Sequence, residues 1–272
     1  MRLNLPKLAQ YPAPVRLGLF VVILGLFWLP LAAPIYLLVD DPNLVTILTM
    51  ALLFGEFLGL LKVWGRSVYR EPQLLKQYGL YSSRRNGIDL LNGLSIGLVF
   101  TLGLFALEGG LGWLNFQPPP EQLGRIILEG LVSALGIGLA EELVFRGWLL
   151  DELERDYSPK LSLWADALIF ATLHFLKPIA EIIRTLPGFP GLVLLGLTLV
   201  WAKRGQGRLG LPIGLHGGLV WGYYIINVGQ LVQYSGQVSP WITGVDGNPI
   251  AGFMGLAFLM VLALGIRARF IK

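Results

Sequence analysis

The sequence predicts an all-α polytopic membrane protein, a transmembrane helical bundle of about eight spans. Of its 272 residues, 54% are hydrophobic and only 14% are charged, and the mean hydropathy is +0.66. An ordinary soluble domain carries about 25% charged residues. Several apolar runs also approach or exceed the ~20 residues that a helix needs to cross the hydrocarbon core of a bilayer. We therefore expect the bilayer to be the solvent for most of the chain.

Apolar runs separated by polar punctuation define the expected helices in order. Prolines lie at several junctions between the runs, where a helix must begin or end, and so support this division of the chain. The predicted helices span residues 17–39, 43–63, 88–113, 124–150, 161–177, 189–202, 208–228 and 250–267.

The first run is expected to stay in the protein as a membrane span. Residues 17–39 are longer than the ~7–15 apolar residues of a signal-peptide core, although the Ala32-Ala33 pair is a candidate cleavage site. Pro30 and Pro34 lie inside this run and should kink its helix. The segment 64–87, after the second run, is too polar to span; we expect an interfacial segment or a plain loop.

Basic residues in short loops predict the orientation of the spans. Arg2, Lys7 and Arg16 precede the first helix, and further basic residues lie between the second and third helices. Such loops remain in the cytoplasm, and an even number of spans returns the chain to the same side. We therefore expect a multi-pass protein of the cell membrane with both termini cytoplasmic, and with residues 229–249 on the opposite side.

The remaining composition excludes some functions. The net charge is +4 and the pI is near 9.4, but the basic residues lie in short clusters between apolar runs. That distribution is typical of topology signals and membrane lipid contacts, and we expect no nucleic acid partner. The chain has no cysteine, so disulfides, thiolate nucleophiles and Cys-ligated metals are excluded. No internal repeat or second soluble domain is evident, which predicts a single membrane domain over residues 1–272.

Charged residues inside the fourth apolar run are the first candidates for function. Ionisable side chains deep in a bilayer are costly and usually have a functional reason. Glu142 and Arg146 are four residues apart and share a helix face, so they can form an ion pair. Glu141 is rotated from Glu142 by about 100° around the helix and stays free of that pair.

The two histidines of the chain, His174 and His216, also fall within predicted helices. Counting 1.5 Å per residue from the cytoplasmic helix ends, Glu141, His174 and His216 lie at depths of roughly 14, 20 and 12 Å. Antiparallel helices can equally well place such groups at opposite faces of the membrane, so this agreement in depth is informative. A carboxylate beside an imidazole can position and deprotonate water, and a second imidazole can stabilise an oxyanion. This combination predicts a peptide hydrolase.

The motifs resemble those of a known family. Glu141-Glu142-x-x-x-Arg146, then Phe170-x-x-x-His174, then His216, in this order on successive membrane helices, are similar to the CAAX prenyl protease and bacteriocin-processing (CPBP) family of intramembrane glutamic endopeptidases. The resemblance covers the fourth to seventh predicted helices, residues 124–228, as a catalytic core. It implies a helical core around a water-filled chamber that opens to the cytoplasm.

The resemblance also implies roles for individual residues. Glu141 is expected to be the general base on the attacking water, His174 to help hold that water, and His216 to stabilise the oxyanion. Glu142, Arg146 and Phe170 are then expected to be supporting residues. The family's third motif has Asn or Asp four residues after its histidine, whereas this chain has Val220.

The missing donor at Val220 leaves alternatives open. Loss of one oxyanion donor typically lowers the rate by ~10²–10³, so activity is weakened rather than forbidden. Tyr223 is two helical turns beyond His216, and Asn227 lies about 16 Å along the axis, too far to replace the donor. Val220 also motivates a second hypothesis, a catalytically inert scaffold or chaperone of the same fold.

Other uses of the same residues come from different classes. Two imidazoles and a carboxylate can ligate zinc, but no HExxH spacing is present, so we expect no cofactor and keep a zinc metalloprotease as the lesser reading. A proton-coupled transporter also uses buried Glu and His residues, although paired broken helices are not evident. The preferred hypothesis is an endopeptidase acting on a membrane-associated peptide or protein substrate, for which a prenylated CAAX sequence is the family's suggestion.

Overall fold

The computed structural model describes residues 5–270, and within it the chain divides into two compact units. The first unit is formed by the residues up to Gln77 together with Glu152–Asp156, and the second by Tyr78–Asp151 and the residues from Tyr157 onward. The prediction of a single membrane domain remains a prediction.

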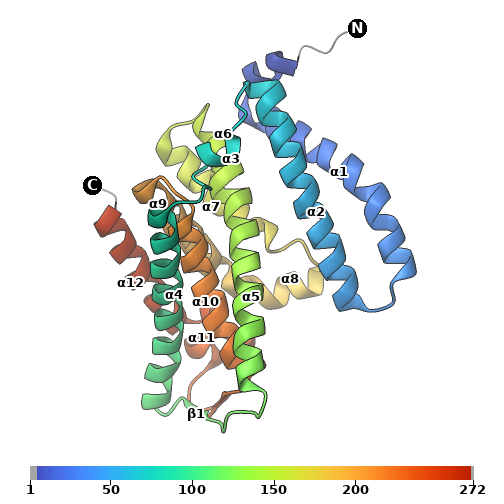
Figure 1. The fold of residues 1–272 in the computed structure, drawn as a ribbon. Helices are drawn as coiled ribbons and strands as arrows, with labels where there is room; N and C mark the ends of the chain where they lie inside the picture. The colour runs from blue at the N-terminus through green and yellow to red at the C-terminus, as the bar shows by residue number, and fades with distance from the viewer. Residues whose placement is uncertain (1–4, 271–272) are drawn as a thin grey trace. The chain divides into compact units, whose positions relative to one another are not determined.

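The first unit is an antiparallel pair of long helices, α1 (Ala13–Leu38) and α2 (Pro42–Trp64) (Figure 1). The connection is short because Asp41 caps α2: its Oδ1 accepts hydrogen bonds from the backbone N–H groups of Asn43 and Leu44 at 2.8 and 3.2 Å. The helices pack through aromatic rings, with the Phe20 ring 5.4 Å from that of Trp64. The unit also contains a 3₁₀ helix Leu5–Gln10, a π-helical turn Gly65–Tyr69 and α3 (Leu74–Gln77).

The second unit contains most of the remaining elements. In chain order these are α4 (Arg84–Gly110), β1 (Leu114–Phe116), α5 (Leu123–Glu142), a π-helix Leu143–Leu149, α6 (Leu150–Glu154, whose last residues belong to the first unit), α7 (Pro159–Leu173), α8 (Ile179–Thr185), a 3₁₀ turn Leu186–Gly188, α9 (Phe189–Gln206), α10 (Gly210–Val228), β2 (Val232–Tyr234), α11 (Pro240–Thr243), 3₁₀ turns Val245–Gly247 and Pro249–Ala251, and α12 (Phe253–Phe270).

Helix α10 lies at the centre of the second unit, packed against α4, α5 and α9 (Figure 1). The contact with α4 is backbone to backbone, because Gly93 and Gly97 of α4 face Gly214 and Gly218 of α10. A Cβ atom added to Gly97 would lie 2.6 Å from the backbone nitrogen of Leu219. Small residues spaced four apart are the usual means of close helix approach in membranes.

All eight predicted membrane helices are helical in the structure, and six stretches within residues 5–270 are long and apolar enough to cross a bilayer. The helices that correspond to the fifth and seventh predicted spans, α7 and α10, are not among the six. Helix α7 is short and ends at Leu173 rather than at the expected residue 177, because a turn leads into Pro178. Helix α10 is rich in glycine and largely enclosed by other helices. The six stretches are Ala13–Leu38, Pro42–Tyr69, Arg84–Gly110, Leu123–Glu154, Ile179–Gln206 and Phe253–Phe270.

Two connections contain structure that the sequence did not predict. Strands β1 and β2 form an antiparallel pair in which Asn115 faces Gln233, so the expected loop 229–249 contains a strand. Each strand has only three residues, which is too short for an alternating pattern to be recognised. Glu181 and Arg184 form an exposed ion pair, at 2.5 Å, on the separate helix α8.

Candidate active site

A buried group of charged residues lies where α5 continues into the π-helix. Arg146 donates from Nη1 to Oε1 of Glu142 at 2.9 Å, which confirms the ion pair predicted from their spacing. The other side of the guanidinium faces Asp166 of α7, with Nε 3.4 Å from Oδ1, and Nη2 donates to the carbonyl of Gly196 in α9 at 3.2 Å. All three charged side chains are fully buried. The arginine thereby connects α5, α7 and α9.

Small residues allow these helices to come close enough for such contacts. A Cβ atom on Gly138 of α5 would lie 2.8 Å from the carbonyl oxygen of Ile213 in α10. One on Gly196 of α9 would lie 2.8 Å from the Cα atom of Ala167 in α7. Gly138 lies four residues before Glu142 in α5. The carbonyl of Gly196 accepts the hydrogen bond from Arg146. The close approaches therefore set the spacing of the helices around it.

His216 is held by the same carboxylate oxygen as Arg146. Nδ1 of His216 lies 2.9 Å from Oε1 of Glu142, and its side chain is only 5% exposed. A carboxylate only accepts hydrogen bonds, so the proton of this bond belongs to Nδ1. Nε2 of the ring is consequently the atom directed away from Glu142. The orientation of His216 is thus fixed by a buried acceptor, as is common for functional histidines.

Glu141 lies between the Nε2 atoms of the two histidines. Its Oε2 atom is 3.7 Å from Nε2 of His174 and 3.9 Å from Nε2 of His216. Both distances are too long for direct hydrogen bonds, and Oε2 is buried without a hydrogen-bond partner in the described part of the chain. The structure therefore brings together the three residues that the sequence placed at similar depth.

His174 follows the last residue of α7 rather than lying inside a helix. Its Nδ1 atom is 2.8 Å from the carbonyl oxygen of Phe170, which can only accept, so Nδ1 carries a proton and Nε2 is the ring nitrogen that lies toward Glu141. The fully buried Phe170 ring packs on both sides: it is 4.5 Å from the His174 ring and 4.3 Å from the guanidinium carbon of Arg146. Phe170 thus contacts both the His174 ring and the Arg146 guanidinium.

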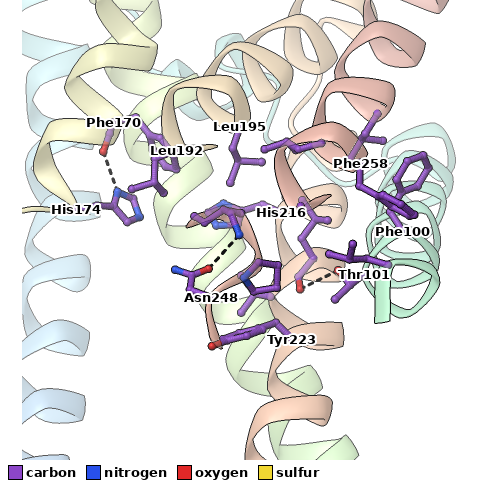
Figure 2. A pocket seen from close by; sticks show the side chains of 18 residues that line it. Phe100, Thr101, Phe170, His174, Leu192, Leu195, His216, Tyr223, Asn248 and Phe258 are labelled. Carbon is purple, nitrogen blue, oxygen red and sulfur yellow. Dashed lines mark hydrogen bonds between the residues drawn. The ribbon is translucent and has the colours of Figure 1, made fainter. Parts of the chain in front are cut away.

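The histidines line a cavity of about 240 Å³ (Figure 2). Most of its wall is apolar, formed by leucine, isoleucine and phenylalanine side chains of α4, α9, α10, α12 and the turn before α12. Val220 and Tyr223 of α10 also line it, whereas Asn227 lines a different cavity, near the strand pair. The position that carries Asn or Asp in the family is therefore on the wall, but without a polar group.

Asp166 and Asn248 are the residues of this region that sequence reasoning missed. Asp166 had a signal: it is an acid inside an apolar run, four residues before Phe170 and on the same helix face. Asn248 had none, because it lies in a long connection whose position depends on tertiary packing. No group of three or more His, Asp or Glu side chains within residues 5–270 has an arrangement suited to a metal ion.

The fold and this geometry define a class: a polytopic helical membrane protein with an acid and two histidines gathered inside its helical core. Residues 123–222 match the model of a family described as Type II CAAX prenyl endopeptidase Rce1-like. The match covers the helices that carry the motifs and confirms the resemblance to the CPBP family. It supports a protease function of the CAAX type within the membrane. Neither the curated proteins nor the solved structures gave a match.

Proposed function

We propose that this protein is an intramembrane endopeptidase that hydrolyses a peptide bond by glutamate-activated water, without a metal. The observation that carries the proposal is the position of Oε2 of Glu141 between two Nε2 atoms, at 3.7 and 3.9 Å. Glu141 accepts one proton of the attacking water. The Nε2 lone pair of His174 accepts a hydrogen bond from the other O–H group of that water. The water oxygen then presents a lone pair to the substrate carbonyl.

His216 takes a different role because its Nδ1 already donates to Glu142. To donate from Nε2 toward an oxyanion while Nδ1 donates to Glu142, His216 must carry a proton on each ring nitrogen. An oxyanion donor of this kind acts most strongly in a buried, water-poor site.

The cavity supports a substrate that brings an apolar group close to the scissile bond. His174 and His216 line the same cavity as the side chains of Leu192, Leu195 and Phe258 (Figure 2). A prenylated CAAX-type peptide meets this requirement, because its isoprenoid chain is apolar and lies near its cleaved bond. We therefore propose a membrane-associated substrate, with a prenylated peptide as the first to test. The cell membrane and cytoplasmic termini belong to the same proposal.

The test is cleavage of quenched fluorescent peptides, with and without a prenyl group, by the purified full-length protein. Glu141→Gln should reduce cleavage to background while the protein remains folded, because an amide cannot accept the proton. The matched control is Glu129→Gln, the same change on the same helix at an exposed residue paired with Arg125. Full activity of Glu141→Gln would reject Glu141 as the base, and loss of activity with chelator would favour zinc instead.

One observation favours a second function, an inert scaffold or chaperone of the same fold. Val220 gives no donor on the cavity wall next to His216. If neither wild type nor Val220→Asn cleaves any peptide of the panel, while a membrane partner co-purifies equally with wild type and Glu141→Gln, the scaffold is the better description.

A further inference from the structure

The cavity wall carries a carboxamide that comes from outside the motif-bearing helices. Asn248 precedes the 3₁₀ turn Pro249–Ala251, just before α12, and lines the same cavity as His174 and His216. In Figure 2 its side chain lies on the histidine side of the cavity, with Tyr223 farther along α10. A primary amide is one of the groups that enzymes use to donate to an oxyanion.

The other polar groups on this wall are accounted for. Besides Asn248, the polar lining consists of the two histidines, Thr101 and Tyr223. The hydroxyl of Thr101 donates to the carbonyl oxygens of Gly97 and Leu219, at 3.1 and 3.3 Å, and so serves the α4–α10 contact. Tyr223 lies two turns from His216, about 10 Å along the helix axis. Asn248 and Tyr223 are therefore the side chains from which a second donor can come.

Hydrogen bonds fix which end of the Asn248 amide is free. Its Oδ1 accepts from the backbone N–H of Ile250 at 3.3 Å, capping the 3₁₀ turn. The oxygen is thus committed to the backbone, and the NH₂ end, with two donors, is the end left for a ligand. The backbone of Asn248 is also tied down, because its N–H donates to Val245 at 3.1 Å and its carbonyl accepts from Ala251 at 2.9 Å.

The turn that carries Asn248 is docked on the helical core. Gly191 near the start of α9 meets Ile250 so closely that an added Cβ would lie 2.8 Å from the Cβ of Ile250. Ala251 is buried. A donor that is held by packing and by backbone hydrogen bonds needs little reorganisation when charge develops, which is the property that makes an oxyanion donor effective.

We propose that Asn248 supplies the second oxyanion donor in place of the residue missing at Val220. This inference rests on the proposed function. The oxygen of the attacking water forms a bond to the carbonyl carbon, its proton passes to Glu141, and the carbonyl electron pair moves onto oxygen. That oxyanion accepts from Nδ2 of Asn248 and from Nε2 of His216. When the electron pair on the oxyanion forms the C=O bond again, the C–N bond breaks and Glu141 delivers the proton to the leaving nitrogen.

The test separates a catalytic from a structural role by keeping the cap while removing the donor. Asn248→Asp retains an oxygen for the Ile250 N–H but loses the NH₂ group, so kcat should fall by ~10²–10³ with an unchanged melting temperature. Asn248→Ala should show the same loss of kcat. The double variant Asn248→Ala/Val220→Asn should have a kcat at least tenfold higher than that of Asn248→Ala, because the new amide lies one helical turn from His216 and lines the same cavity. Tyr223→Phe should lower kcat far less than either Asn248 variant.

The outcomes distinguish this inference from the proposed function. If wild type cleaves and both Asn248 variants equal it, the donor role of Asn248 is wrong and the glutamate mechanism stands. A loss confined to Tyr223→Phe would transfer the role to Tyr223. Cleavage by Val220→Asn but not by wild type would mean that the native chain has no second donor, which also overturns the inference. Failure of every variant to cleave would remove the proposed function and this inference together.

Discussion

Nδ1 of His216 and Oε1 of Glu142 lie 2.9 Å apart, and the same oxygen accepts the hydrogen bond of Arg146. One buried carboxylate oxygen therefore orients a histidine of α10 and anchors the arginine that ties α5 to α7 and α9. The tandem glutamates consequently make different contacts. Oε1 of Glu142 contacts both Arg146 and His216, whereas Oε2 of Glu141 lies 3.7 and 3.9 Å from the Nε2 atoms of the two histidines.

Glu142→Gln is expected to destabilise the protein as well as lower its activity. The change removes the negative charge that Arg146 and His216 share, and leaving a buried charge without its partner typically costs about 3–5 kcal/mol. The free energy of unfolding, measured by denaturant titration in detergent micelles, should fall by that order. Glu141→Gln, whose carboxylate is 31% exposed and makes no ion pair with arginine or lysine in residues 5–270, should leave it nearly unchanged. Equal stability of the two variants would contradict this division of roles.

Gly97→Ala should weaken the fold, because α4 and α10 touch there through their backbones. The added methyl would lie 2.5 Å from the carbonyl oxygen of Leu215 and 2.6 Å from the nitrogen of Leu219, so the helices must separate. We expect a loss of about 1–3 kcal/mol in the free energy of unfolding. Gly103→Ala on the same helix is the control, since its nearest atom would be 3.9 Å away. A Gly97 variant as stable as this control would show that the helices can separate without cost.

Leu192→Phe should discriminate between substrates if the cavity receives an apolar group. Leu192 is on the cavity wall and the larger ring reduces the space available. We expect KM for a prenylated peptide to rise several-fold, with less change for a peptide that lacks the prenyl group. The same substitution at Leu194, on α9 but away from this wall, is the control. An equal change for both peptides would place the apolar group elsewhere.

The helices and the residues of the candidate site were predictable because each has a local signal. Long apolar runs are required of membrane helices whatever their neighbours, and a spacing of four residues places Glu142 beside Arg146 on any helix. The convergence of Glu141, His174 and His216 followed from depth alone, once the orientation of the spans was assigned. Equal depth does not determine whether these side chains are neighbours in the bundle, and only the structure shows that they are.

Features that depend on docking were not predictable. Asn248 reaches the cavity because its turn packs on Gly191, a contact between segments more than 50 residues apart for which neither segment has a periodic pattern. The end of α7 just before His174 has a similar origin: Pro178 allows the stop, but the exact turn is set by the bond from His174 to Phe170. Local sequence predicts elements well and their mutual contacts poorly when the contacts are made by glycines and turns.

Arg16→Lys should destabilise the first unit although the charge is kept. Arg16 donates from Nε to Oε2 of Glu152 at 2.8 Å and from Nη2 to the carbonyl of the same residue at 3.1 Å, and Glu152 also accepts from the hydroxyl of Tyr69 at 2.5 Å. A lysine is a point donor and cannot reproduce this fork. With the arginine side chain only 2% exposed, the expected loss is about 2 kcal/mol in the free energy of unfolding. Arg125→Lys, in a pair whose arginine is 78% exposed, is the matched control and should be neutral. Identical unfolding curves for the two lysine variants would mean that the fork contributes no more than a surface ion pair.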